Sequence, residues 1–129
     1  MKQISEAFSR RLQNTGITRI QWIALYYIKD NPSISQRELS NKMRVKDSSI
    51  GRLLDRLERD ELVVKERSSK DRRIIYVNLT EKGDKLIEEC LPLGAKFNKD
   101  LTKGISEEEL KIFENVIMKL KSNVVEEDV

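Results

Sequence analysis

The sequence contains no histidine and only one cysteine, Cys90, among its 129 residues. Histidine is the commonest general base and the commonest transition-metal ligand, so its absence argues against a Ser–His triad and the usual zinc sites. A single cysteine excludes an internal disulfide framework. Because no glycine-rich loop or carboxylate cluster offers another catalytic arrangement, we expect no enzymatic activity, no cofactor and no metal site.

Long apolar runs are also missing. No segment approaches the roughly 20 apolar residues that span a membrane, and residues 1–14, MKQISEAFSRRLQN, lack the apolar stretch of a secretory signal. These features predict a cytoplasmic protein without a membrane partner. The length fits one domain, with room for extensions that mediate dimerisation.

Charge is distributed unevenly along the chain. The net charge is +3 over residues 1–35, +4 over residues 36–85 and −4 over residues 86–129. A basic first two-thirds suggests that one part of the molecule faces a polyanion. Solvated surfaces of mixed charge are common, however, and the charge pattern alone leaves that second interpretation open.

Hydrophobic periodicity predicts two helices at the start of the chain. Ile4, Phe8 and Leu12 recur at every fourth position and form one apolar stripe over residues 2–14. Thr18 is the predicted N-cap of a second helix that ends near Asp30. This second helix is apolar or aromatic nearly all round, so we expect it in the middle of the fold.

A pair of short helices follows. Ser35 and Glu38 form a capping box, with Ser35 as N-cap, which opens a helix ending near Met43. Asp47 is expected to cap the next helix, over residues 48–60. Two short helices joined by so tight a turn predict a helix-turn-helix, although unrelated helical hairpins share the pattern.

Two segments of strand length come next. Residues 62–67 and 73–79 are rich in β-branched side chains and flank a polar tip at residues 68–72, which predicts a hairpin. A hairpin directly after a helix-turn-helix is a wing, and this combination is far more specific than either part. The expected fold is mostly α with a small β-hairpin wing: a winged helix-turn-helix with a helical dimerisation region.

The last third of the sequence predicts two further helices. Thr80 opens a helix to about Leu101, in which Cys90 lies on the apolar stripe that also includes Leu86, Leu93 and Phe97. A thiol there behaves as a small hydrophobe, so we interpret Cys90 as a core residue rather than a redox sensor. Ser106 caps a final helix with a heptad seam, typical of a helix packed along another helix, formed by Leu110, Phe113, Ile117, Leu120 and Val124. Residues 126–129 are expected to fray.

The second helix of the helix-turn-helix has a face that could read DNA. Its apolar residues face inward, and the N-terminal part of such a helix enters the major groove. Candidates for base-edge contacts are Ser48, Ser49 and Arg52, while Arg56 suits a phosphate. The alternative is an ordinary amphipathic helix with a solvated charged face, on which Asp55 and neighbouring carboxylates neutralise the arginines.

The tip of the predicted wing favours DNA binding. Basic side chains cluster around one turn where core packing does not require them, and arginine is attracted to the negative potential of a narrow minor groove. The candidate DNA-binding residues in this basic cluster are Arg67, Lys70, Arg72 and Arg73.

From residue 20 to 86 the chain resembles the MarR family of winged-helix regulators. The resemblance is carried by residues 18–25, 35–40 and 48–58, and most specifically by Asp71-Arg72-Arg73 leading into residues 79–83, Leu-Thr-Glu-Lys-Gly. It implies that Arg73 enters the minor groove while Asp71 holds it in place. The chain departs from the family at Asp60-Glu61, where glycine is usual, so one of these two residues is expected to have positive φ. It also departs at Lys65, where arginine is usual.

The resemblance also implies a dimer, built from the N-terminal helix at residues 1–17 and the helices at residues 80–129, with residues 18–79 as the DNA-binding domain. The dimerisation residues would be Ile4, Phe8, Leu12, Leu110, Phe113, Ile117, Leu120 and Val124. The predicted function is a homodimeric transcription regulator that binds a pseudo-palindromic operator in double-stranded DNA.

The regulator implied by the resemblance is a repressor relieved by a small-molecule effector. An effector pocket could be lined by Trp22, Tyr26 and Tyr27, for which simple core packing is the alternative. A different class of function stays open as well: a winged-helix module that binds proteins and not DNA.

Overall fold

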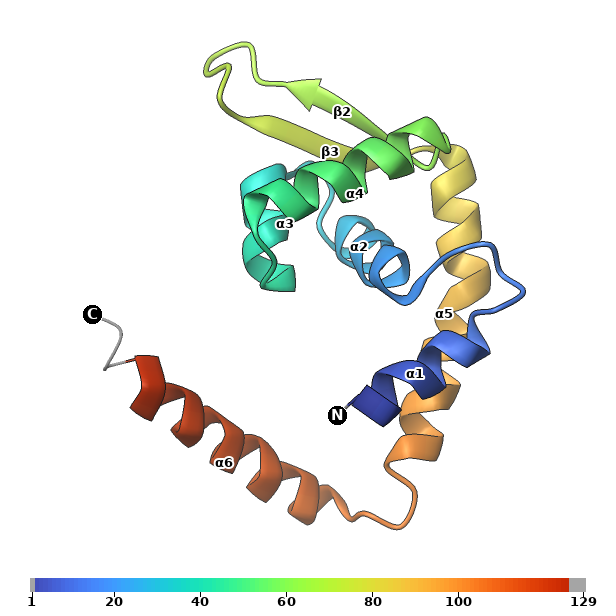
Figure 1. The fold of residues 1–129 in the computed structure, drawn as a ribbon, viewed down its shortest axis with the longest axis vertical. Helices are drawn as coiled ribbons and strands as arrows, with labels where there is room; N and C mark the ends of the chain where they lie inside the picture. The colour runs from blue at the N-terminus through green and yellow to red at the C-terminus, as the bar shows by residue number, and fades with distance from the viewer. Residues whose placement is uncertain (1, 126–129) are drawn as a thin grey trace. The chain divides into compact units, whose positions relative to one another are not determined.

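The structure is a computed structural model in which residues 2–125 are described; the residues expected to fray, 126–129, lie outside this range. Within it the chain is mostly helical with one small sheet, as predicted (Figure 1). The elements are α1 (Lys2–Arg11), α2 (Arg19–Asp30), β1 (Ile34–Ser35), α3 (Gln36–Met43), α4 (Asp47–Arg59), β2 (Val63–Arg67), β3 (Ile75–Leu79), α5 (Glu81–Leu101) and α6 (Glu107–Val125). None of the described helices has the length and apolar character required to cross a membrane.

The chain divides into two compact units, residues 1–97 and residues 98–129. The first unit contains the helix-turn-helix, the wing and the N-terminal helix α1. This boundary differs from the functional division at residues 17 and 79 that the sequence suggests. That division stays a prediction about roles and does not describe separate compact units.

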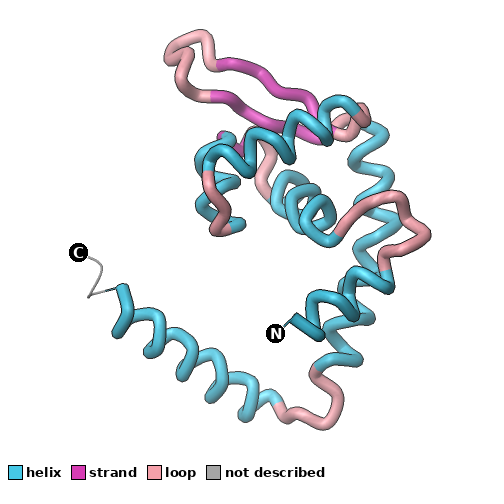
Figure 2. The backbone as a smooth tube through the Cα atoms, in the orientation of Figure 1, coloured by secondary structure: helices cyan, strands magenta, loops and turns pink. Residues whose placement is uncertain are grey.

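The sheet has three antiparallel strands in the order β1-β3-β2, one more than the sequence predicts. The extra strand β1 pairs Ile34 with Val77 of β3, while Lys65 of β2 pairs with Val77 from the other side. At two residues, β1 is too short to show a period of two, which explains why the sequence missed it. Figure 2 shows the loop that joins β2 to β3. The loop is longer than predicted because β3 begins at Ile75 and not at residue 73, whereas β2 ends at Arg67 as predicted.

The core of the first unit lies between α2, α4, the sheet and α5. Leu25, Ile50 and Val77 are fully buried in it. Two details correct the sequence interpretation. Helix α2 is not buried all round, since Ile20 and Tyr26 are exposed on its outer side.

The second detail concerns which residues of α5 (Glu81–Leu101) are buried. Ile87 and Cys90 are buried, whereas Leu86, which the predicted stripe included, is only partly buried. The assignment of Cys90 to the core is confirmed. The predicted stripe included Leu86 in place of Ile87 because residues 86 and 87 lie four and three positions before Cys90, and both spacings are compatible with one helical face.

Helix starts follow the predicted caps at three places. Thr18, Ser35 and Ser106 each accept a hydrogen bond from the backbone three residues on, at 3.2, 3.0 and 3.1 Å respectively. Each of them forms a complete capping box, since the side chain at the third helical position accepts a bond from the cap backbone amide. These local signals fix where α2, α3 and α6 begin.

Candidate nucleic-acid interface

The turn between α3 and α4 is set by backbone geometry and one side-chain bond. Arg44 ends α3 in the left-handed region at φ 57°, and the Val45 amide donates to the Ser40 carbonyl at 3.1 Å. The prediction that Asp47 caps α4 is wrong: the N-cap is Lys46, and Asp47 is the first helical residue. Its carboxylate instead accepts a hydrogen bond from the Ser40 hydroxyl at 3.0 Å, which ties α4 to α3.

Helix α4 separates its apolar and polar residues cleanly. Ile50, Leu54 and Leu57 are fully buried. The predicted DNA-reading side chains are all on the exposed surface of the helix, at Ser48, Ser49, Arg52 and Arg56. Within residues 2–125, neither the Arg52 nor the Arg56 side chain has a hydrogen bond or ion pair, so both guanidinium groups are available to an anionic partner.

The carboxylates of α4 are occupied elsewhere. The Lys65 ammonium on β2 lies 2.6 Å from Asp55 and 3.6 Å from Glu58. The hydrogen bond from Lys65 lowers the pKa of Asp55, and the same bond raises the pKa of Lys65. Asp55 and Glu58 therefore pair with the wing strand, and among residues 2–125 neither forms an ion pair with Arg52 or Arg56, which weakens the alternative of a merely solvated charged face.

The tip of the wing is held by its own polar groups. The Ser68 hydroxyl accepts from the amides of Lys70 and Asp71 at 3.2 and 3.1 Å. The Arg67 guanidinium donates to the carbonyl of Arg72. Arg67, a predicted DNA contact, thus also braces the turn on which the other basic residues stand.

Arg73 and Asp71 are joined by three hydrogen bonds at this tip. The Asp71 carboxylate accepts from the backbone amide, Nε and Nη2 of Arg73 at 3.0, 3.1 and 3.1 Å. The Arg73 side chain holds the pKa of Asp71 below its ordinary value. The side chain of Arg73 is nonetheless 90% exposed. Asp71 therefore orients a guanidinium group that still faces solvent, the arrangement that the resemblance implies.

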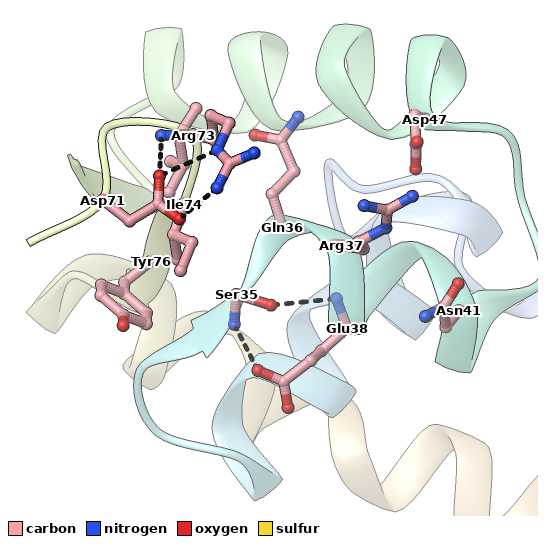
Figure 3. Close-up of a pocket in the computed structure, with 11 residues that line it drawn as sticks. Ser35, Gln36, Arg37, Glu38, Asn41, Asp47, Asp71, Arg73, Ile74 and Tyr76 are labelled. Atoms are coloured by element: carbon pink, nitrogen blue, oxygen red, sulfur yellow. Dashed lines mark hydrogen bonds and ion pairs between the residues drawn. The ribbon is translucent and has the colours of Figure 1, made fainter. Parts of the chain in front are cut away.

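A groove lies between α3 and the wing (Figure 3). It encloses about 660 Å³, and its walls include Gln36, Arg37 and Asn41 of α3, with Arg73 and Tyr76 on the wing side. The sequence does not predict a role for these three α3 residues. The polar outer face of the predicted helix was the available signal, but only the fold brings that face next to the wing.

The predicted dimerisation residues fall into two groups. Phe8 and Leu12 are buried within the first unit, where Phe8 packs edge-on against Trp22 at 5.2 Å between ring centroids. Leu12 lies just beyond the end of α1. Their burial in a single chain favours a core role over a contact with a partner. Ile4, by contrast, is exposed.

Helix α6, in the second unit, presents much apolar surface. Phe113 is 62% exposed, and Ile112 and Met118 outside the predicted seam are exposed as well. Leu110 and Ile117 are partly buried, while Leu120 and Val124 are exposed. Several large apolar side chains exposed on one helix are typical of a protein–protein contact.

The aromatic residues proposed for an effector pocket pack on one another. The rings of Trp22 and Tyr26 stack at 5.6 Å, and the Trp22 Nε1 donates to the Cys90 carbonyl at 3.0 Å. Trp22 and Tyr27 contact the core. The groove between α3 and the wing does not include any of these three residues. A role in effector binding stays a prediction.

A winged helix-turn-helix protein is defined by two short helices in tight succession, by α2 behind them and by a three-stranded sheet whose β2–β3 hairpin forms the wing. The MarR family model matches residues 15–74. The chain is 30% identical over 110 residues to the HTH-type transcriptional regulator YsmB of Bacillus subtilis, a match that covers 85% of this chain and 75% of the relative. The chain therefore belongs to the MarR family of transcriptional regulators.

Solved structures agree with this fold. A mutant form of MarR from E. coli, crystallised with operator DNA, is 27% identical with a TM-score of 0.83, and the match covers 92% of this chain and 86% of that one. The MepR–DNA complex of S. aureus has a TM-score of 0.87 at 22% identity, covering 95% of this chain and 90% of that one. The second likeness concerns the fold alone.

Proposed function

We propose that this transcription regulator acts as a homodimer that binds a pseudo-palindromic operator through α4 and the wing. Ser48, Ser49 and Arg52 face the base edges of the major groove, and Arg56 faces a phosphate. At the wing, Arg73 enters the adjacent minor groove, oriented by Asp71. The proposal includes no catalytic step and no cofactor.

The observation that carries the proposal is the pairing of charges around α4. Asp55 and Glu58 are drawn to Lys65, so Arg52 and Arg56 keep their charge on the exposed face. Arg73 stands 90% exposed on a braced tip. Exposed arginines on a helix and on a neighbouring hairpin are the footprint of a nucleic-acid surface. The related E. coli MarR has been crystallised with operator DNA, in keeping with this role.

The dimer in this proposal uses the exposed apolar residues of α6 and Ile4 of α1. Exposing an apolar side chain such as Phe113, which is 62% exposed, is costly in water, and a second copy that covers α6 would remove this cost. Sedimentation of the native chain should give a dimer at micromolar concentration, and Phe113→Glu should shift it toward monomer. A stable native monomer of 15.1 kDa would refute the dimer.

We also propose where the protein acts and how its DNA binding is regulated. The chain acts in the cytoplasm as a repressor, and a small molecule that binds near Trp22, Tyr26 and Tyr27 relieves repression. A quench or shift of Trp22 fluorescence on titration with small aromatic acids, together with loss of DNA binding, is the expected sign of such an effector. The single tryptophan makes the signal specific to this site.

The DNA-binding part is tested by measuring affinity for duplex DNA against salt concentration. The native chain should show a steep linear fall of log K with log salt, because each neutralised phosphate releases counterions. Arg73→Ala should make the slope shallower by about 0.9, the value for one lost contact. The matched control is Lys103→Ala, which removes an exposed charge outside the first unit and should change nothing. A flat salt response of the native chain would indicate a protein-binding module instead.

A further inference from the structure

We infer that Asp47 selects a cytosine at one base pair of the bound DNA, and that the buried Ser40 hydroxyl positions it for this role. The inference rests on the proposed function and deepens it, because it adds a residue that determines specificity to those that face the major groove. The sequence predicted Asp47 only as a helix cap, a position that Lys46 occupies.

Ser40 is a buried polar side chain that reaches from α3 to α4. Within residues 2–125, the buried polar or charged side chains are Gln21 and Ser40. The Gln21 side chain accepts from the Thr18 backbone amide at 3.0 Å and so belongs to the capping box of α2. Ser40 is 2% exposed, and its hydroxyl donates to Oδ1 of Asp47 at 3.0 Å. A buried hydroxyl requires a hydrogen-bond partner, and here the partner is the first residue of α4.

The hydroxyl of Ser40 has a choice between two acceptors. Its oxygen lies 2.8 Å from the Arg37 carbonyl oxygen and 3.0 Å from Oδ1 of Asp47. One proton serves one acceptor at a time, and the charged carboxylate is the stronger of the two. The Ser40 carbonyl also accepts from the amide of Val45 in the turn, at 3.1 Å. Ser40 therefore holds both the turn and one oxygen of the Asp47 side chain.

The second oxygen of Asp47 is left for a partner outside the chain. Asp47 is exposed, and no hydrogen bond or ion pair within the described part of the chain occupies its Oδ2. Arg37 lines the same groove, yet among residues 2–125 it forms no ion pair with Asp47. In Figure 3 the Asp47 side chain extends from the start of α4 toward α3. An exposed carboxylate thus stands at the end of α4 that enters the major groove.

The chemistry of a carboxylate at this place selects its target. An ionised carboxylate only accepts hydrogen bonds, and it repels phosphates. In the major groove cytosine presents the N4 amino group, a donor, whereas guanine presents the acceptors N7 and O6 and thymine the acceptor O4. Asp47 accepts from cytosine and disfavours guanine and thymine at the same place. Because Ser40 holds the other oxygen, turning away from a wrong base would cost that hydrogen bond.

The test selects duplexes from a random library with the native chain, and then measures affinities for the selected site and for versions with one base pair changed. The native chain should require cytosine at one base pair of each half-site. Asp47→Asn should lose roughly tenfold in discrimination there, because an amide donates as well as accepts and therefore tolerates guanine or thymine. The same variant should bind unrelated duplex DNA up to roughly fivefold more tightly at low salt, because a charge that repels phosphates is gone.

Ser40→Ala keeps the charge of Asp47 and removes the group that holds it. This variant should lose discrimination at the same base pair, while its affinity for unrelated duplex DNA stays native. In the Asp47→Asn background, Ser40→Ala should cost little further discrimination, because both changes act through one contact.

Each variant has a matched control. Asp60→Asn removes an exposed charge at the other end of α4, and it should leave every base preference unchanged. Ser35→Ala removes the hydroxyl that accepts from the Glu38 amide at the start of α3, and it does not touch Asp47. It should lower the urea unfolding midpoint and keep the native base preferences. All affinities are compared at a temperature at which each variant is folded.

The inference is overturned if Asp47→Asn keeps the native base preferences, if it weakens binding to all duplexes alike, or if Ser40→Ala leaves discrimination at the cytosine unchanged. Failure of the proposed function gives a different result. If the native chain does not bind duplex DNA, both are wrong. If it binds, and Arg52→Ala reduces sequence discrimination while Asp47→Asn does not, only the role of Asp47 and Ser40 is wrong.

Discussion

The Nζ of Lys65 lies 2.6 Å from the Oδ1 of Asp55, and this ion pair joins wing strand β2 to helix α4. Lys65 is the more enclosed partner, with its side chain 21% exposed. The pair has two consequences for a DNA-binding surface. It ties the wing to the helix, and it places a positive charge next to the negative charge of Asp55.

Replacing Lys65 should therefore weaken DNA binding beyond any loss of stability. Lys65→Gln releases Asp55 and Glu58, raises the pKa of Asp55 toward its ordinary value, and leaves their negative charge beside the DNA. We expect Lys65→Gln to bind more weakly than the native chain, and the double variant with Asp55→Asn to recover part of the loss. Fluorescence anisotropy with labelled duplex DNA measures both.

Lys65→Arg serves as the control for this pair, because it keeps the charge and can still reach Asp55. It should bind DNA nearly as well as the native chain. If Asp55→Asn fails to improve binding in the Lys65→Gln background, repulsion by the released carboxylate is not the cause of the loss.

The sequence was a good guide wherever a signal was local. The capping boxes at Thr18, Ser35 and Ser106 involve residues three apart, so they could be recognised without knowing the fold. The wrong prediction for Asp47 also came from a local signal, the residue type alone. It is a favoured cap type, but its carboxylate bonds Ser40 on the preceding helix, and Lys46 occupies the cap position.

Features that depend on tertiary contacts could not be predicted. The pairing of Asp55 with Lys65 joins a helix to a strand, and the charges on one helix do not reveal it. The same holds for the groove between Arg37 and Arg73, whose walls are 36 residues apart in sequence. Strand β1 forms because Ile34 pairs with Val77 at the free edge of β3. A strand of two residues is too short to be predicted from its sequence pattern.

Glu61 confirms the expectation that one residue after α4 has positive φ. Its φ is 62°, in the left-handed region that costs a non-glycine residue roughly 1–2 kcal/mol. Glu61→Gly should stabilise the chain by up to about 1 kcal/mol, because relief of strain exceeds the entropy that glycine adds to the unfolded chain. The urea midpoint measures the change.

Glu61→Ala is the matched variant for this test. It removes the same carboxylate but keeps the Cβ, so it should give no comparable stabilisation. The Glu61 carbonyl accepts a hydrogen bond from the Thr80 hydroxyl at 2.6 Å, and both variants retain this carbonyl because only the side chain changes. Equal stability of the glycine and alanine variants would show that backbone strain is not the deciding effect.

Gly83 is required by a close approach between α5 and the segment before β2. A Cβ added at Gly83 would lie 1.9 Å from the Leu62 carbonyl oxygen, so the backbone would have to shift. Gly83→Ala should destabilise the chain by roughly 1–3 kcal/mol, the usual cost of overpacking a tight site. At Gly51 the nearest atom would be 3.7 Å away, and alanine is favoured over glycine within a helix by about 1 kcal/mol.

Gly51→Ala is therefore the control, and it should be neutral or stabilising where Gly83→Ala is destabilising. Thermal unfolding followed by circular dichroism compares the two variants directly. A Gly83→Ala chain as stable as the native one would mean that the first turn of α5 can move away from Leu62 at little cost.

Cys90 should react slowly with thiol reagents while the chain is folded. It is 3% exposed, and burial raises the pKa of its thiol, with the charge of Glu89 acting in the same direction. Because the thiolate is the nucleophile, both effects suppress reaction at pH 8. Because the thiol pKa is raised in the folded chain, the neutral thiol contributes to the free energy of unfolding. This contribution is complete at pH values below the ordinary pKa of about 8.5, and it is lost as the pH rises through the raised pKa. Alkylation by iodoacetamide, followed by mass spectrometry, should be much faster in urea than in buffer. Equal rates in the two solvents would contradict the core assignment and favour a reactive, sensing cysteine.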